Sequence, residues 1–313
     1  MKSTSEQGAL NRQESINRLK QTNCFDLLIV GGGATGLGVA LDAASRGLSV
    51  ALVERYDYAK GTSSRATKLV HGGVRYLAQG NVSLVREALR ERKALLDNAP
   101  HLAQPIPFLM PSFGCKGRFW DMPLYGVGLV LYDKLAGDRG LGDTEFLSRD
   151  NTLAAMPGVQ ANNLVGSVRY WDGQFDDARL AIALARTAVT KGATLLNYCP
   201  VTTLLHDNGK VNGACVHEQE SGEVFNIHAR CVINATGVWV DELRRMDVDP
   251  DSHLVAPSQG VHLAVDRDFL PGDHVLLVPK TDDGRVLFAV PWLGKVLLGT
   301  TDTARDYIEV EPT

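Results

Sequence analysis

The sequence has few cysteines, and their spacing is not that of a metal site. The 313 residues contain five, at Cys24, Cys115, Cys199, Cys215 and Cys231. Because no CxxC pair occurs and the set is odd and scattered, the sequence argues against both a zinc site and a disulfide framework. This usage fits a reducing compartment.

Long apolar runs and an excess of basic charge are also missing. No run reaches the ~20 residues that a membrane-spanning helix needs. The net charge of −4 gives no reason to expect nucleic acid as a partner. The N-terminal residues are polar, without the apolar stretch of a secretory signal, and Glu6 and Glu14 argue against a mitochondrial transit peptide. We therefore expect residues 1–23 to be a polar extension before the fold.

A strand–helix–strand pattern follows this segment. Residues 25–30, FDLLIV, predict a buried parallel strand, and GGGATG comes directly after them. Residues 37–48 have apolar positions at helical spacing, and residues 49–54, SVALVE, predict a second buried strand. Together they predict one βαβ unit of about thirty residues.

The glycines between the first strand and the helix have the spacing of a dinucleotide-binding turn. Gly31 permits the tight turn, Gly33 lets the backbone approach a pyrophosphate, and Gly36 lets helix and strand pack closely. The helix N-terminus then offers N–H groups to the phosphates. Glu54 ends the second strand and can bind ribose hydroxyls. The motif alone leaves FAD and NAD as alternatives.

The later chain predicts a mixture of helices and antiparallel strands. Helices are expected over 81–99, 122–137 and the first part of 176–196, and strands dominate 201–237 and the chain from 253 onward. The segment 105–125 is interpreted as a connection between domains. The helix over 122–137 is either a packed core helix or a membrane-surface contact; the absence of a basic polar face favours the core.

The fold class is therefore α/β. We expect a discontinuous Rossmann-like FAD/NAD(P)-binding domain over 24–99 and 151–249. A second, mainly antiparallel β domain, over 100–150 and 250–313, would serve as the substrate or cap domain.

Two features favour FAD as the nucleotide. The first helix carries small residues at Ala40, Ala44 and Gly47, a pattern that resembles FAD-dependent oxidoreductases. A distant apolar strand ends in Ala235, Thr236 and Gly237, and it resembles the second flavin-contacting strand of that class. An ordinary exit from strand to turn is the alternative for this second feature.

Residues 62–77, TSSRATKLVHGGVRYL, combine groups suited to redox chemistry. Ser63 and Ser64 can donate hydrogen bonds to a pyrophosphate or flavin, and the pair Gly72–Gly73 lets backbone lie close to a flat ring. His71 suits removal of a hydroxyl proton, and Arg75 suits a phosphate or carboxylate. The alternatives are a structural histidine, an arginine paired with a carboxylate, and a solvated Lys68.

Several segments together resemble the FAD-dependent glycerol-3-phosphate dehydrogenases. They are LLIVGGGATGLGVALDAASRGLSVALVE, GTSSRATKLVHGGVRYL, DDARL, NATGVWVD and LLGTTDT. The resemblance runs collinearly from about residue 25 to the last residue. It implies FAD-dependent oxidation of sn-glycerol 3-phosphate to dihydroxyacetone phosphate, in a fold like that of D-amino-acid oxidase.

The resemblance also implies residue roles. Gly31, Gly33, Gly36 and Glu54 would hold the ADP half of FAD, with Val201 on the adenine side. Further cofactor contacts would come from Ser63, Ser64, Lys68, Leu69 and Ala235 to Gly237. His71 and Arg75 would face the substrate, with Tyr76 beside them and Thr301 on the substrate-side sheet.

Further expectations concern partners and location. The resemblance implies quinone as electron acceptor, or O₂ as in the oxidases of that family. It implies a cytoplasmic protein with peripheral contact to the cytoplasmic face of the membrane, and a homodimer as its assembly. The sequence lacks the family's GVRPL-like and GGK-x-T-x-YR segments and its C-terminal helical domain, so we expect an N-terminal portion of such an enzyme.

Two other functions remain open on the residues alone. An amine or 2-hydroxy-acid oxidase could share the fold. A truncated, non-catalytic nucleotide-binding remnant needs only the first motif.

Overall fold

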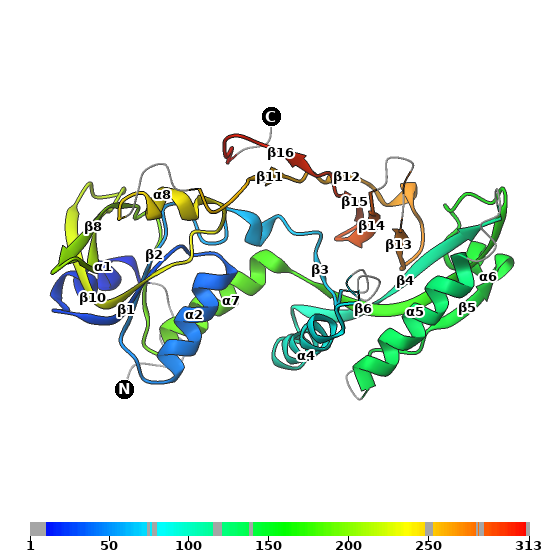
Figure 1. The fold of residues 1–313 in the computed structure, drawn as a ribbon, viewed down its shortest axis with the longest axis horizontal. Coiled ribbons are helices and arrows are strands. Elements are labelled where there is room, and N and C mark those ends of the chain that lie inside the picture. Colours follow the sequence, from blue (N-terminus) through cyan, green and yellow to red (C-terminus); the bar gives the residue numbers. More distant parts are fainter. Residues whose placement is uncertain are drawn as a thin grey trace. The chain divides into compact units, whose positions relative to one another are not determined.

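A computed structural model of the chain describes residues 11–73, 76, 80–114, 121–137, 140–247, 253–279, 281 and 285–310. The chain divides into two compact units (Figure 1). Unit 1 comprises the segments Met1–Ala66, Asp177–Ser258 and Ala304–Thr313, and unit 2 comprises Thr67–Asp176 and Gln259–Thr303.

Unit 1 is built on a six-stranded sheet in the order β7-β2-β1-β10-β9-β8. The first four strands in this order are parallel, and β9 and β8 continue the sheet antiparallel. The bounds are β1 Phe25–Val30, β2 Val50–Val53, β7 Thr194–Leu196, β8 Val201–Asp207, β9 Lys210–His217 and β10 Val224–Asn234. The predicted βαβ unit is confirmed as β1, α2 and β2.

Both faces of the parallel strands are buried, which explains their unbroken apolar sequences. Successive residues of β2 alternate between two hydrophobic clusters, with Val50 and Leu52 in one and Ala51 and Val53 in the other. On the first of these faces lie α2 (Ala34–Ser45) and α7 (Asp177–Thr190), side by side in Figure 1. Both helices present alanines, so they can approach the sheet and each other closely.

The other face carries a helix in the segment predicted to be a polar extension. Helix α1 (Arg12–Gln21) buries Ile16 and Leu19 in a hydrophobic cluster with residues of the sheet, and it lies against β7 and β10. Arg12 forms an ion pair with the buried carboxylate of Glu218. The prediction of an extension over residues 1–23 missed this helix, because two apolar residues among many polar ones give a weak periodic signal.

Unit 2 is built on an eight-stranded, mostly antiparallel sheet. Its order is β12-β15-β14-β13-β4-β6-β3, with β5 paired to β6. The bounds are β3 Leu69–Val70, β4 Ala103–Phe113, β5 Glu145–Ser148, β6 Leu164–Phe175, β12 Leu263–Asp266, β13 Val275–Val278, β14 Leu287–Trp292 and β15 Lys295–Gly299. The α/β fold class, with a second and mainly antiparallel part, is confirmed.

The segment 105–125, interpreted as a connection, is largely a strand of this sheet. Strand β4 pairs with β6 along eleven positions and includes Pro105, Pro107 and Pro111. All three prolines occupy odd-numbered positions, so their missing N–H groups fall on one edge of the strand, while the other edge keeps its donors. The prediction of a connection was wrong because it took proline as a strand breaker.

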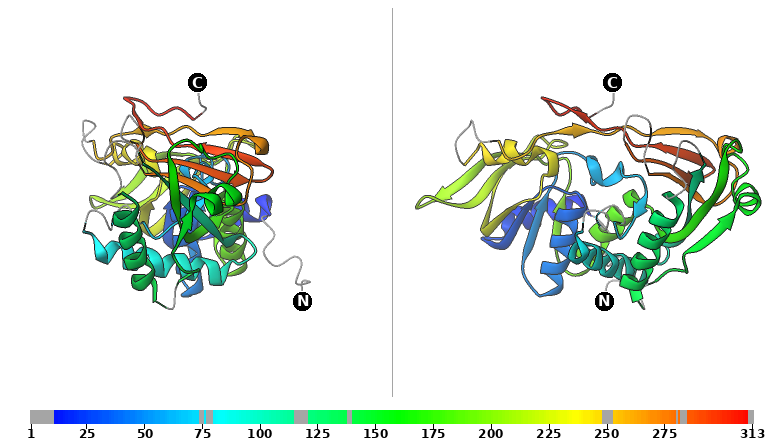
Figure 2. Two further views of the ribbon diagram at one scale, coloured as in Figure 1. Left: turned by 90° about the vertical axis from the view of Figure 1, so that its right-hand side faces the viewer. Right: turned by 45° about the vertical axis from the view of Figure 1, so that its right-hand side comes forward.

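Helices α4 (Val82–Asn98), α5 (Asp121–Ala136) and α6 (Arg149–Ala155) complete unit 2. Helices α4 and α5 lie side by side, as Figure 2 also shows. Tyr132 and Ala136 of α5 are buried against Val85 and Leu89 of α4. These contacts support the interpretation of 122–137 as a packed helix.

The observed units differ from the predicted domain boundaries in four places. Residues 253–258 and 304–310 were assigned to the substrate or cap domain, but they belong to unit 1. Residues 67–99 and 151–176 were assigned to the nucleotide domain, but they belong to unit 2. The reason is pairing: β3 and β4 both pair with β6, and α4 packs on β4.

Short elements join the larger ones. They are η1 Thr62–Ser64, η4 Gly237–Trp239, α8 Val240–Arg244, β11 Ser258–Gln259, η5 Arg267–Phe269 and β16 Thr303–Ala304. Among the residues that the structure describes, no helix combines the length and apolarity needed to cross a bilayer.

Candidate nucleotide-binding site

The turn after β1 is closely packed around its glycines. Gly31 has φ +113°, and a β-carbon there would lie 2.5 Å from the carbonyl oxygen of Ala235. A β-carbon at Gly36 would overlap the carbonyl oxygen of Gly31. Glycine is therefore required at Gly31 and at Gly36 for α2 to pack on the sheet. These contacts agree with the roles predicted for the two glycines, a tight turn at Gly31 and close helix packing at Gly36.

Glu54 connects this turn to the end of β2. Its carboxylate accepts hydrogen bonds from the N–H of Gly32 at 2.5 Å and from the N–H of Tyr56 at 2.8 Å. The two bonds hold the carboxylate at the carboxyl end of the parallel strands, the edge where α/β sheets bind ligands. Each carboxylate oxygen keeps a further lone pair, which a ribose hydroxyl could use.

Ser63 closes the N-terminus of α2 from outside the helix. Its Oγ accepts a hydrogen bond from the N–H of Ala34 at 2.9 Å, since Gly33 at the N-cap has no side chain to do so. A β-carbon at Gly33 would meet only Ser63, 3.1 Å from its Oγ. The hydroxyl proton of Ser63 stays available to a phosphate, next to the positive end of a twelve-residue helix.

The turn after β10 is organised by one amide. Asn234 donates through Nδ2 to the carbonyl of Val240 at 2.9 Å, and its Oδ1 accepts from the hydroxyl of Thr236 at 2.6 Å. These bonds hold Ala235 against the glycine turn and bring the 3₁₀ helix η4 over the sheet edge. Trp239, at the end of η4, faces Tyr56 with 5.9 Å between the ring centroids.

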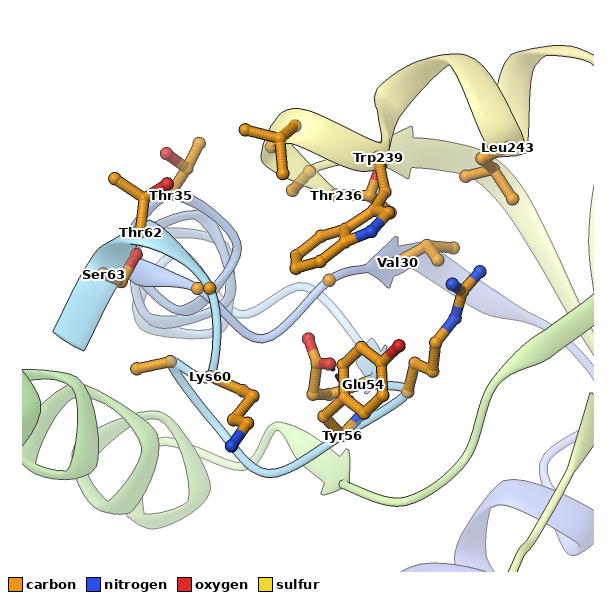
Figure 3. Close-up of a pocket in the computed structure, with 18 of the residues that line it drawn as sticks. Val30, Thr35, Glu54, Tyr56, Lys60, Thr62, Ser63, Thr236, Trp239 and Leu243 are labelled. Carbon is orange, nitrogen blue, oxygen red and sulfur yellow. Dashed lines mark hydrogen bonds between the residues drawn. The ribbon is translucent and has the colours of Figure 1, made fainter. Parts of the chain in front are cut away.

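These segments enclose a cavity of about 470 Å³, within the range of small-molecule and cofactor sites. Figure 3 shows Trp239 above Tyr56 and Glu54, with Thr35, Thr62 and Ser63 grouped beside the start of α2. The predicted residues that line it are Gly31, Gly33, Glu54, Ser63, Val201, Ala235, Thr236 and Gly237. Gly36 supports this wall from behind.

One part of the cavity is apolar. Val201, Leu243, Met246 and Val255 line it together with Cys199. Burial and the neighbouring Glu218 raise the pKa of the Cys199 thiol to about 12, so the thiol stays protonated and acts as an apolar wall. Such a surface suits a planar base.

The remaining predicted residues belong mostly to unit 2. Ser64 lies in η1 of unit 1, whereas Lys68, with φ +64°, and Leu69 at the start of β3 are in unit 2. His71 is exposed, and Tyr76 is 42% exposed and donates its N–H to the carbonyl of Gly73. Thr301 accepts from the N–H of Val261 at 2.9 Å. Arg75 lies outside the described residues.

The cavity contains side chains that the sequence analysis did not select. They are Thr35, Arg55, Tyr56, Lys60, Thr62 and Trp239. Arg55 forms an ion pair with Glu242 at 2.8 Å; burial opposes its charge, but this carboxylate outweighs burial and raises the pKa of Arg55. An aromatic residue within a few positions of each of two strand ends, at Tyr56 after β2 and at Trp239 after β10, was the available signal.

A family model described as FAD dependent oxidoreductase matches residues 26–313. The chain belongs to the FAD-dependent oxidoreductase family. This match covers both units and includes every motif described above, so the cavity of this FAD-dependent oxidoreductase is the site where the family's cofactor is expected.

Individual relatives are glycerol-3-phosphate dehydrogenases. The mitochondrial enzyme of Bos taurus is 45% identical over 309 residues, which are 95% of this chain and 42% of the relative. The mitochondrial enzyme of Saccharomyces cerevisiae is 42% identical over 336 residues, covering 97% of this chain and 51% of the relative. The chain thus spans about half the length of the curated relatives it matches.

A solved structure has the same fold over nearly the whole chain. The glycerol-3-phosphate dehydrogenase from Bacillus halodurans, complexed with FAD, has a TM-score of 0.76 and 35% identity. It covers 96% of this chain, which corresponds to 51% of that protein.

The residues present fit the ADP part of FAD. Gly33 and the N-terminus of α2 leave room and donors for a pyrophosphate, and Glu54 lies where ribose hydroxyls can reach it. The apolar wall around Cys199 and Val201 suits adenine. When bound, FAD would supply the acceptor for a hydride.

Proposed function

We propose that this FAD-dependent oxidoreductase oxidises sn-glycerol 3-phosphate to dihydroxyacetone phosphate, with hydride transfer to FAD. The observation that carries the proposal is the 42–45% identity to glycerol-3-phosphate dehydrogenases along at least 95% of this chain. The aligned part of the chain includes both the glycine turn and the His71–Tyr76 segment.

We assign the cofactor contacts to one set of residues. Gly31, Gly33, Gly36 and Glu54 hold the ADP half, and Val201 contacts adenine. Ser63, Ser64, Lys68, Leu69 and Ala235 to Gly237 contact the pyrophosphate and flavin. Tyr56 and Trp239 join this set because their rings line the cavity.

We assign the substrate contacts to residues of unit 2. His71 takes the hydroxyl proton of glycerol 3-phosphate while the hydride leaves its carbon, since a neutral imidazole nitrogen can accept a proton. Arg75 binds the phosphate through two N–H groups of its fork. Tyr76 and Thr301 contribute hydrogen bonds to the bound substrate.

The electron acceptor, location and assembly are part of the same proposal. We assign quinone as the acceptor and a peripheral contact with the cytoplasmic face of a membrane, in a cytoplasmic homodimer. Reoxidation of reduced flavin by a soluble quinone but not by O₂ is expected. Sedimentation with phospholipid vesicles tests the membrane contact, and measurement of the mass in solution tests the homodimer.

Anaerobic flavin reduction tests the proposed reaction directly. The purified protein, loaded with FAD, is mixed with glycerol 3-phosphate, and the visible flavin band is expected to bleach. Glycine and lactate serve as controls for amine and 2-hydroxy-acid oxidation and are expected to leave the band unchanged. Bound flavin that no polyol phosphate bleaches would contradict the proposal and support a non-catalytic nucleotide-binding protein.

A further inference from the structure

A buried charged cluster in unit 2 contacts the backbone beside His71. It consists of Arg92 on α4, Tyr132 on α5 and Asp172 on β6, and we call it the Tyr132 cluster. Arg92 and Asp172 are each 1% exposed, and a 2.8 Å ion pair joins them. Residues of this kind are seldom fully buried unless paired, so the cluster calls for an explanation.

The cluster is connected by further hydrogen bonds. The Tyr132 hydroxyl lies 3.0 Å from the second oxygen of Asp172, and an N–H of Arg92 approaches the same hydroxyl at 3.4 Å. Burial, followed by the charge of Asp172, raises the pKa of Tyr132 well above its usual value. The hydroxyl therefore stays protonated, donates to Asp172 and keeps its lone pairs for donors.

One of these donors is the N–H of Gly72, at 2.8 Å from the Tyr132 oxygen. Gly72 directly follows His71, and it is buried. A β-carbon at Gly72 would overlap the Tyr132 hydroxyl and lie 2.5 Å from Leu89 Cδ2. From the sequence, this glycine is expected where backbone lies close to a flat ring. The contacts described here give it a second reason, since a side chain would exclude the hydroxyl.

The other side of His71 is also held. Strand β3 ends at Val70, which pairs with Gly173 of β6, and the N–H of Gly173 donates to Asp172 at 3.1 Å. Because the strands are antiparallel, the residue of β6 that lies beyond Gly173, in the direction in which the chain leaves β3, is Asp172. The residues on both sides of His71 are therefore held in place. Val70 before it is paired with Gly173, and Gly72 after it donates its N–H to Tyr132.

We propose that the Tyr132 cluster is a positioning device that fixes the backbone of His71 for proton removal from the substrate. The inference rests on the proposed function, because it takes His71 as the base. Tyr132 is a positioning residue: it acts through Gly72 and contacts neither substrate nor cofactor. A base must be held within a few tenths of an ångström of its working position to act efficiently. This need for precise positioning explains why a buried ion pair is present at a place where apolar side chains would allow the protein to fold as well.

Tyr132→Phe tests the proposal, with Tyr170→Phe as the matched control. Tyr170 is also a buried tyrosine of unit 2, but it stacks on Phe108 and makes no described contact with Gly72. In the FAD-loaded protein, Tyr132→Phe is expected to lower the rate constant of flavin reduction about tenfold, the effect of about one lost buried hydrogen bond. The half-saturating concentration of glycerol 3-phosphate should change less than twofold. Tyr170→Phe should leave both values unchanged.

Hydrogen exchange gives a readout that does not need activity. The peptide over residues 69–73 should exchange about tenfold faster in Tyr132→Phe, with β4 and β14 unchanged and the Tyr170→Phe protein like the wild type. If Tyr132→Phe does not fold, the double variant Arg92→Met/Asp172→Asn replaces it, since it weakens the bonds to Tyr132 without leaving an unpaired buried charge.

The outcomes separate the two proposals. If the wild-type flavin is not bleached by glycerol 3-phosphate, the proposed function fails, whatever the exchange result. If it is bleached and His71→Asn slows it, but Tyr132→Phe leaves both the rate and the exchange of residues 69–73 unchanged, the positioning role is overturned.

Discussion

At the scale of single residues, the glycines of α2 differ in what surrounds them. Gly36 is buried with no room for a β-carbon, because the carbonyl of Gly31 occupies that space. Gly38, two positions along the same helix, has nothing within 4 Å of a β-carbon. Only the first is required by packing, although both stand within a glycine-rich segment of the sequence.

This contrast gives a matched pair of substitutions. Gly36→Ala should lower the free energy of unfolding by ~1–3 kcal/mol or more through overpacking and weaken FAD binding. Gly38→Ala should raise it by about 0.5–1 kcal/mol, since alanine is the better helix former. Urea denaturation of both variants checks the prediction. Equal effects in the two proteins would contradict the packing described for Gly36.

His71 and Arg75 should differ in kinetic effect if their proposed roles are right. His71→Ala should chiefly slow flavin reduction, in the range of about 10²–10⁴-fold that general-base catalysis contributes. Arg75→Ala should chiefly raise the half-saturating concentration of glycerol 3-phosphate, because the phosphate loses a two-point contact. Stopped-flow reduction over a range of substrate concentrations separates the two effects. The reverse pattern would show that the roles are exchanged.

At the scale of elements, α1 is tied to the sheet by a buried carboxylate. Glu218 follows β9 and is fully buried, yet it accepts hydrogen bonds from Arg12, Ser221 and the N–H of Glu220. Burial acts to raise the pKa of Glu218, but these bonds outweigh it and lower the pKa to about 2. Helix α1 is therefore held by the carboxylate of Glu218, which the folded structure keeps in its charged form.

The sign of the resulting pH dependence follows from linkage. A pKa lowered on folding adds stability above the unfolded pKa, near 4.5, and this stability is lost as pH falls towards 2. We expect this group to contribute about 3 kcal/mol at neutral pH, disappearing between about pH 5 and pH 2. Unfolding free energies of wild type and Glu218→Gln across this range provide the measurement. Parallel curves for the two proteins would rule out the linkage.

At the scale of the whole molecule, each unit has its own sheet and its own hydrophobic clusters. Every described residue that lines the cavity belongs to unit 1, in the chain around residues 30–63 and 199–255. The residues proposed for the substrate, His71, Tyr76 and Thr301, are in unit 2. FAD binding can therefore be measured independently of turnover.

Saturating FAD should stabilise the protein against heat. A ligand at about 100 times its dissociation constant adds about 2.7 kcal/mol, which corresponds to a rise of several degrees in Tm. Gly33→Val should remove most of this rise, because its side chain would fill the space beside Ser63 at the start of α2. Thermal unfolding with and without FAD checks both proteins. The same rise in Gly33→Val would place the phosphates elsewhere.

Local sequence patterns were sufficient to predict those parts of the site whose residues lie close together in the chain. The βαβ unit, the glycine spacing and Glu54 lie within 30 residues, and periodicity together with phosphate chemistry determines them. The turn at Ala235–Gly237, directly after β10, was also predicted, since an apolar run before a turn is a local signal. Strand β4 was missed because its prolines were taken as strand breakers. Only the pairing reveals that their missing N–H groups share one edge.

The sequence by itself determined the α/β class, the nucleotide turn and the family, because each depends on residue type at short spacing. Only the tertiary structure decided that α1 packs on the sheet, that Tyr56 faces Trp239 across the cavity, and that Tyr132 bonds Gly72. Gly72 and Tyr132 are 60 positions apart in the sequence, and Arg92 and Asp172 are 80 positions apart. No periodicity reaches that far, since such contacts form only when separate elements pack around a shared core.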